Sequence, residues 1–164
     1  DDNSLDILSG KIQTYDKEPE YKKYKNIITK VNFSNFKNIS SIEIVFRRES
    51  IVDNDILFDP DFGLGSLKFP KGGEETIFIK DSLNKGLKIN YFPIYLVKHP
   101  YESSGKKEIS IEDKFFFLGG YTRRIFGRKG FIFILYFCFK YFKQINSYKK
   151  IKKSFNFFFK GFNN

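Results

Sequence analysis

Two adjacent carboxylates, Glu74 and Glu75, directly follow a pair of glycines at positions 72 and 73. The apolar spacing after them predicts a helix, whose first-turn N–H groups carry partial positive charge that favours carboxylates. A carboxylate at such a helix start, beside glycines that let a ligand approach, is suited to take a proton from a hydroxyl group. The alternative is a pair of solvated acids that only stabilise the helix. On the pattern alone, this second interpretation is preferred.

Several elements must position these carboxylates. Apolar residues at helical spacing predict one buried face of the helix, and Gly86 ends it; the face consists of Ile79, Leu83 and Leu87. Residues 88–98 are then predicted to be extended. Pro93 places this strand at a sheet edge or interrupts it, because proline cannot donate to a ladder. His99, the only histidine of the chain, follows directly.

Upstream segments predict two more strands. Residues 41–48 alternate between apolar and polar types, which indicates a strand whose one face carries Ile42, Ile44 and Phe46. Residues 5–15 predict another strand with a break at Gly10, and 49–56 favour one or two helical turns. The Gly and Pro residues of 59–65 predict a turn-rich loop. Strands and helices in this order indicate an α/β fold.

Basic residues are segregated along the chain. Residues 121–164 hold 11 of the 29 Lys and Arg residues and none of the 19 Asp and Glu residues, so residues 1–120 are close to neutral. A nucleic-acid-binding domain more often spreads its basic residues over the folded surface, so this segregation favours an appended surface-binding segment. We predict a domain over 1–120 and a basic, aromatic, helical tail over 121–164. The charged segment 16–25 is predicted to be a solvent-facing connection or short helix.

Two segments of the tail are candidates for membrane contact. Residues 131–142 are nearly all apolar but fall short of the roughly 20 residues that a spanning helix needs, so a buried or half-inserted helix is predicted. Residues 147–162 carry one apolar stripe among lysines, made of Ile151, Phe155, Phe158 and Phe162. That pattern is typical of a cationic amphipathic helix in the headgroup layer. It equally suits a helix that packs on the domain and turns its lysines to solvent.

Length and composition set wider bounds. A chain of 164 residues suits one domain or part of a larger one. Because it contains no methionine and starts with Asp1, we expect a fragment of a longer protein. The single cysteine, Cys138, cannot form an internal disulfide, so nothing indicates a secreted, oxidised protein.

Four segments, in order, resemble the second half of a family 2 glycosyltransferase with the GT-A fold: SIEIVFRRESI, FDPDFGLGS, GGEET and KGLKINYFPIYLVKHP. In that family they correspond to a strand ending in an FRR-like pattern, the motif FDE.FG.G, the motif GED at a helix start, and a strand that ends before a histidine. The match covers roughly residues 5–105, and the ordered set is more specific than any one segment. The basic, aromatic end resembles the membrane-proximal ends of such enzymes.

The resemblance implies transfer of a sugar from a nucleotide-diphosphate donor to a saccharide or lipid-linked acceptor, with inversion. Glu75 matches the second acid of the GED motif and would be the catalytic base, although the family usually has Asp there. Glu74 matches the first acid and would contact the acceptor or hold the loop. His99 matches a histidine that binds a divalent cation, Mg²⁺ or Mn²⁺, at the diphosphate. Most other ligands of that ion would lie in an N-terminal half, which we expect to precede this chain.

Further residues are candidates for substrate binding. In the loop, the ring of Phe62 can stack on a sugar, while Gly63 and Gly65 permit close backbone approach. Gly73 does the same beside the acids. Arg47, at the end of a strand, faces solvent or a phosphate. The alternatives are a plain turn for the loop and an ordinary salt bridge for the arginine.

We therefore predict the acceptor-side half of a glycosyltransferase in surface polysaccharide or glycolipid synthesis. It would lie in the cytoplasm, bound peripherally to the inner face of the cell membrane through residues 121–164, with no nucleic-acid partner. Two other functions stay open: a basic, aromatic nucleic-acid-binding module, and a membrane-surface interaction protein without catalysis. Salt-dependent nucleic-acid binding that survives removal of residues 121–164 would favour the first.

Overall fold

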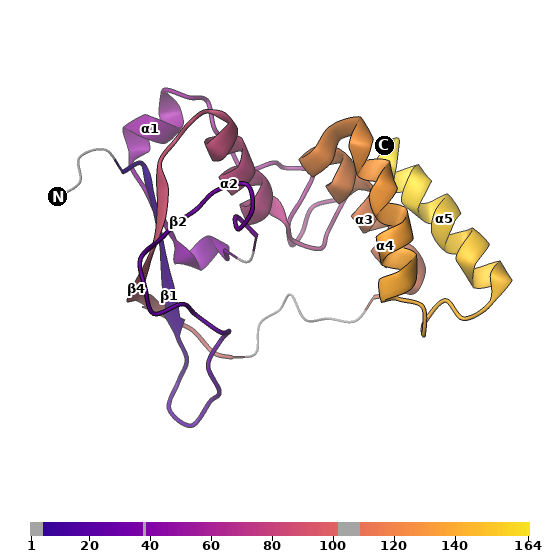
Figure 1. The fold of residues 1–164 in the computed structure, drawn as a ribbon, viewed down its shortest axis with the longest axis horizontal. Helices are drawn as coiled ribbons and strands as arrows, with labels where there is room; N and C mark the ends of the chain where they lie inside the picture. Colours follow the sequence, from indigo (N-terminus) through magenta and orange to yellow (C-terminus); the bar gives the residue numbers. More distant parts are fainter. Residues whose placement is uncertain (1–4, 38, 102–108) are drawn as a thin grey trace. The chain divides into compact units, whose positions relative to one another are not determined.

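The computed structural model describes residues 5–37, 39–101 and 109–164 of the chain, which forms two compact units (Figure 1). Unit 1 comprises Asp1–Pro60 and Glu74–Lys106, and unit 2 comprises Asp61–Gly73 and Lys107–Asn164. Unit 1 contains a mixed β-sheet and unit 2 contains helices, which confirms the α/β class. The boundary predicted at residue 120 falls inside a helix of unit 2, so the structural units differ from the two predicted parts.

The sheet of unit 1 has four strands in the order β2-β4-β1-β3 among the described residues. Their bounds are β1 Ile7–Gln13, β2 Thr29–Lys30, β3 Ile44–Phe46 and β4 Ile89–Lys98. The central strand β1 runs parallel to β4 and antiparallel to β3, while β2 pairs antiparallel with β4. Because β1 has a neighbour on both sides, its residues are buried at Ile7, Ser9, Gly10 and Ile12.

The β1–β4 pairing is irregular around Pro93. Ser9 pairs with Tyr91 and Lys11 pairs with Tyr95, so β4 carries extra residues between these two pairs. Strand β4 itself runs through Pro93 without a break, so the predicted interruption takes the form of a register shift in its pairing with β1. The break predicted at Gly10 is wrong, because β1 continues through it. Glycine fits there since a Cβ would lie 2.5 Å from the Leu96 Cγ atom.

Strand β3 corrects the prediction for residues 41–48. The strand covers only Ile44–Phe46, and Ser41–Glu43 form the 3-10 helix η1. The predicted faces are wrong as well, since Glu43 is 1 % exposed whereas Phe46 is 43 % exposed. The reason is a capping box: the Glu43 carboxylate accepts a hydrogen bond from the backbone N–H of Ser40, which turns the chain before the strand begins.

Helices α1 (Arg48–Val52) and α2 (Glu74–Asn84) complete unit 1. Both were predicted, and α2 ends as expected at Gly86, whose φ of +81° favours glycine. The buried face of α2 differs from the predicted one, because Ile77, Phe78 and Ile79 are buried. Phe78 stacks on Phe58 with ring centroids 4.5 Å apart and contacts Phe46 of β3 at 5.8 Å.

Unit 2 is built from α3 (Ile111–Phe126), the 3-10 helix η3 (Gly127–Ile132), α4 (Phe133–Lys140) and α5 (Tyr148–Phe162). Two glycines let α3 and α5 approach closely. A Cβ at Gly119 would lie 2.0 Å from the Phe158 carbonyl oxygen, and one at Gly161 would lie 1.9 Å from the Phe116 carbonyl oxygen. Real Cβ atoms do not approach backbone that closely, so only glycine fits at these crossings.

The core of unit 2 is aromatic. Its buried residues are Phe115, Ile134, Phe137, Ile145, Phe158 and Phe162. Two members of the apolar stripe predicted on α5, Phe158 and Phe162, therefore face the interior, and Ile151 and Phe155 pack against the same cluster. Of the two interpretations of this stripe, the structure supports a helix that packs on its own unit. Among the described helices, none combines the length and apolar character that crossing a membrane requires.

Candidate functional site

The predicted catalytic carboxylate, Glu75, lies in the first turn of α2 and opens onto a hollow of about 520 Å³ in unit 1. The hollow is lined by Lys22, Lys23, Ile39, Ser40, Glu75 and Thr76. The Oε1 atom of Glu75 lies 3.4 Å from the backbone nitrogen of Ser41, which donates to it. A carboxylate that is held by one N–H and borders open space can accept a proton from a ligand hydroxyl.

Its neighbour Glu74 has a different environment. Burial raises the pKa of Glu74, and repulsion by the adjacent Glu75 carboxylate raises this pKa further. The Oε2 atom of Glu74 is buried and has no hydrogen-bond partner among the described residues. Glu74 does not line the hollow described above. A general base must be able to reach its proton, and of these two carboxylates Glu75 is the one that lines the hollow.

A second pocket, of about 410 Å³, adjoins the hollow at Glu75 and shares with it Lys22, Lys23 and Ile39. Its lining includes the charged residues Lys22, Lys23, Lys25, Lys37 and Glu43 and the tyrosines Tyr24 and Tyr91. The other lining residues are Ser9, Gly10, Thr29, Val31, Ser34, Asn35 and Ile39. Four lysines against one carboxylate, among the described lining residues, give this pocket a positive field. It suits a ligand that carries a phosphate or carboxylate group.

Glu43 lies at the buried side of this pocket. Its Oε2 atom accepts hydrogen bonds from the Lys22 ammonium group and from the backbone nitrogen of Ser40, the latter at 2.7 Å. Its Oε1 atom is buried without a hydrogen-bond partner among the described residues. A buried carboxylate oxygen with spare accepting capacity is costly unless a donor reaches it, and a sugar hydroxyl is such a donor.

Two tyrosines form the aromatic wall. The rings of Tyr24 and Tyr91 are parallel, with centroids 6.5 Å apart. The Tyr24 hydroxyl accepts from the backbone nitrogen of Ile12 at 3.0 Å, and the Tyr91 hydroxyl donates to the Lys25 carbonyl at 2.8 Å. Burial raises the pKa of both phenols, and the nearby Glu43 carboxylate raises them further. Both therefore stay neutral at physiological pH and serve as hydrogen-bonding groups.

His99 lies elsewhere in unit 1, at the end of β4. Its Nδ1 atom lies 2.7 Å from the Pro100 carbonyl oxygen, and its ring meets that of Tyr21 edge-on at 5.9 Å. The linings of the two pockets do not include it. Within 5–37, 39–101 and 109–164, no three His, Cys, Asp or Glu side chains gather as a metal-binding group. One imidazole does not make a metal site, so a Mg²⁺ or Mn²⁺ ion at His99 stays a prediction.

Arg47 is tied to backbone rather than directed at a pocket. Its Nε atom donates to the Leu5 carbonyl at 2.6 Å, and its side chain is exposed. This bond fastens the start of the α1 segment to the chain just before β1. Phosphate binding by Arg47 stays a prediction.

The other predicted binding residues belong to unit 2. Phe62 is 7 % exposed and stacks on Phe69 with centroids 4.7 Å apart, so packing alone explains an aromatic residue there. Stacking of Phe62 on a sugar stays a prediction without support in this geometry. Gly63, Gly65 and Gly73 have φ angles of +115°, +92° and +94°, which L side chains rarely adopt. At Gly73 a Cβ would also lie 3.0 Å from the Tyr121 ring.

Comparison of the chain with known protein families, with curated proteins and with solved structures gave no match.

The lysine-lined pocket contains residues that sequence reasoning missed. The segment 16–25 was predicted to be a solvent-facing connection, yet Lys22 and Tyr24 both contribute to the pocket. Glu43 was placed on the outer face of a strand. A usable signal was present in residues 21–25, YKKYK, where aromatic and basic residues interleave as they do at binding surfaces.

Proposed function

We propose that this chain is the acceptor side of an inverting glycosyltransferase with the GT-A fold, and that Glu75 is its general base. One observation carries the proposal: the Glu75 carboxylate borders a hollow that shares the lining residues Lys22, Lys23 and Ile39 with the lysine-lined pocket. A proton acceptor therefore lies beside a place where a charged saccharide can bind. The ordered resemblance of four segments to family 2 enzymes supports the same reaction.

In the proposed reaction, Glu75 takes the proton of an acceptor hydroxyl while the hydroxyl oxygen attacks the anomeric carbon of the donor sugar. The bond from this carbon to the diphosphate oxygen breaks, and the diphosphate leaves with the bonding electrons. Because attack and departure occur on opposite sides, the configuration at the anomeric carbon inverts. The role of the chain's own residues is to hold the acceptor and remove its proton.

The pocket favours an acidic acceptor. Lys23 and Lys25 are exposed at its rim and can pair with a phosphate or carboxylate on the acceptor. The buried Oε1 atom of Glu43 can accept from a sugar hydroxyl, and the neutral Tyr24 and Tyr91 rings provide apolar surface. A lipid-linked diphosphate saccharide and a uronic-acid-bearing saccharide both fit this description.

The test is Glu75→Gln in the longest protein that the gene encodes. Release of nucleoside diphosphate is measured over a panel of nucleotide-sugar donors, with acidic and neutral oligosaccharides as acceptors. We expect kcat to fall about 100- to 10,000-fold, because removal of a positioned general base has effects of that size. Glu49→Gln is the matched control, since Glu49 is also a first-turn helix acid, in α1.

The possible outcomes distinguish the role of Glu75 from the proposed reaction itself. If Glu75→Gln keeps wild-type turnover, Glu75 is not the base, even though the chain transfers sugar. If the wild-type protein uses no nucleotide sugar at all, the proposed function is wrong. A Glu74→Gln variant sharpens the assignment, because a residue that orients the acceptor should change KM more than kcat.

A further inference from the structure

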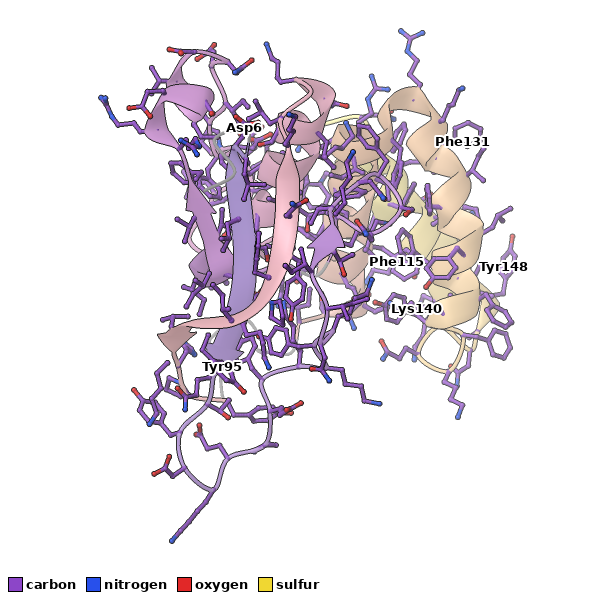
Figure 2. All side chains as sticks on the ribbon, turned by 60° about the vertical axis from the view of Figure 1, so that its left-hand side comes forward. Asp6, Tyr95, Phe115, Phe131, Lys140 and Tyr148 are labelled. Carbon is purple, nitrogen blue, oxygen red and sulfur yellow. The ribbon has the colours of Figure 1, made fainter. Side chains whose placement is uncertain are left out.

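One face of the η3–α4 segment in unit 2 is apolar and open to solvent. Six large side chains along it have exposed fractions between 49 % and 83 %: Phe131, Ile132, Leu135, Tyr136, Phe139 and Phe142. Leu135 and Phe139, four residues apart in α4, lie on one side of that helix, while Ile132 ends η3 and Phe142 lies in the turn after α4. Figure 2 labels Phe131 at one end of this segment and Lys140 at the other. A contiguous exposed apolar patch indicates a binding surface.

The fold holds this face outward. The opposite side of α4 is already packed, since Ile134 and Phe137 belong to the buried cluster of unit 2. Turning the helix to hide Leu135 and Phe139 would pull these two residues out of the core. Segment 131–142 was predicted to be buried or half-inserted, and the structure shows one buried side and one exposed side.

Basic residues border the exposed face along the chain. Arg128 and Lys129 precede it, Lys140 lies between its last two members, Lys143 follows it, and all four are exposed. Residues 121–164 contain no Asp or Glu. A second copy of this chain would bring the same positive charges against these, which costs free energy. An anionic lipid surface complements both the apolar face and the charge, because an amphipathic helix lies with its apolar side in the headgroup and acyl boundary.

We propose that the η3–α4 face is a membrane-docking surface for bilayers that contain anionic phospholipid. The six exposed side chains enter the acyl boundary, and the flanking cations lie at the lipid phosphates. The stripe of α5, which the sequence offered for this role, stays in the core. The proposal concerns unit 2 alone and does not rest on glycosyl transfer, so either can fail without the other.

The test is co-sedimentation of the full chain with phosphatidylcholine vesicles, with and without one third phosphatidylglycerol, at physiological salt. We expect at least about tenfold tighter binding to the anionic vesicles. The double substitution Leu135→Ser and Phe139→Ser should weaken that binding by roughly tenfold or more, because two side chains no longer enter the acyl boundary. Replacing Lys140 and Lys143 by Gln should weaken it by about fivefold per lysine.

The matched control is the double substitution Leu57→Ser and Leu67→Ser. These leucines are as exposed as the tested pair, at 73 % and 104 %, and lie outside the η3–α4 face, so binding should not change. Circular dichroism checks that each variant keeps its helices. Equal binding to both kinds of vesicle, or equal loss in both double variants, overturns the proposal. So does a concentration-dependent dimer in sedimentation velocity that only the Leu135 and Phe139 variant abolishes, since the face would then bind a second copy.

Discussion

The two units are stabilised by different kinds of contact. In unit 1, carboxylates join separate segments: the half-buried Asp6 carboxylate accepts from the Lys88 backbone nitrogen at 2.7 Å and from the Ser50 hydroxyl at 2.6 Å, and Glu43 is buried against Lys22. In unit 2, stacked rings fill the core and glycines set the distance between α3 and α5. The sticks of Figure 2 show Asp6 at the sheet and Phe115 among the helices.

This difference explains where ligand chemistry gathers. Interior polar groups that are only partly satisfied, such as Glu43 and the half-buried Glu74, leave acceptors that a ligand can use. Unit 2 also has one buried oxygen without a partner among the described residues, the Ser154 Oγ atom, but neither pocket lining includes it. The aromatic core of unit 2 leaves one side of α4 exposed and apolar. We infer that unit 1 recognises a small polar molecule and unit 2 a surface.

The largest loss of stability is expected from a substitution that disrupts the close packing of α3 and α5 in unit 2. Gly161→Ala places a methyl group 1.9 Å from the Phe116 carbonyl oxygen, so α5 must move away from α3. We expect a loss of about 2–3 kcal/mol in the free energy of unfolding, even though Ala has the higher helix propensity. Hydrogen exchange should rise over α3 and α5 and not over β1 and β4.

Lys160→Ala serves as the control for this change. It introduces the same residue one position earlier, where the side chain is exposed, and should shift stability by less than about 0.5 kcal/mol. If Gly161→Ala is as stable as Lys160→Ala, the glycines are not required by the helix crossing, and the account of unit 2 is wrong.

The next effect tests the polar interior of unit 1. Glu43→Gln keeps the shape of the side chain and removes the charge that Lys22 pairs with, so we expect a loss of about 1–2 kcal/mol. Exchange should rise around η1 and β1 and stay unchanged over α5. Glu20→Gln makes the same chemical change at an exposed site and should leave the free energy of unfolding unchanged. Equal stability of the two variants would mean that the buried pair contributes nothing to unit 1.

Local signals predicted much of the fold. Glycine and proline residues predicted the start and end of α2 and the irregularity in β4, because the backbone constraints of these residues act within a few positions. The burial of Glu43 could not be predicted from alternation, since it depends on Lys22, which lies 21 residues away in the sequence. The partition of α4 into a buried and an exposed side was equally hidden, because all of its residues before Lys140 are apolar or aromatic.

The candidate site was predictable only in part. Glu75 was singled out by its match to the second acid of the GED motif, because the glycine and helix pattern alone favoured a solvated acid, and the structure places Glu75 on a hollow. Residues from β1, the 22–39 segment, η1 and β4 line the lysine-lined pocket, so no single stretch of sequence predicts it. Its chemistry appears only when the strand order brings those segments together.

The smallest expected effect lies in unit 2, where an ion pair is an exception to the aromatic packing. Lys153 of α5 donates to Glu112 of α3 at 2.7 Å, and this contact lowers the pKa of Glu112. Because the pKa of Glu112 is lowered in the folded state, the ion pair stabilises the protein above the pKa of a glutamate in the unfolded chain, about 4.3, and this stabilisation is lost as the pH falls through the folded value.

Because the pair borders solvent, Glu112→Gln should lower the free energy of unfolding by only about 0.5 kcal/mol at neutral pH. The cost should vanish in acid and shrink at high salt. Lys153→Gln should match it, whereas Lys152→Gln removes an equal charge next to the pair and should cost nothing. An acid-independent loss in Glu112→Gln would show that packing at the helix start, and not the ion pair, joins the two helices there.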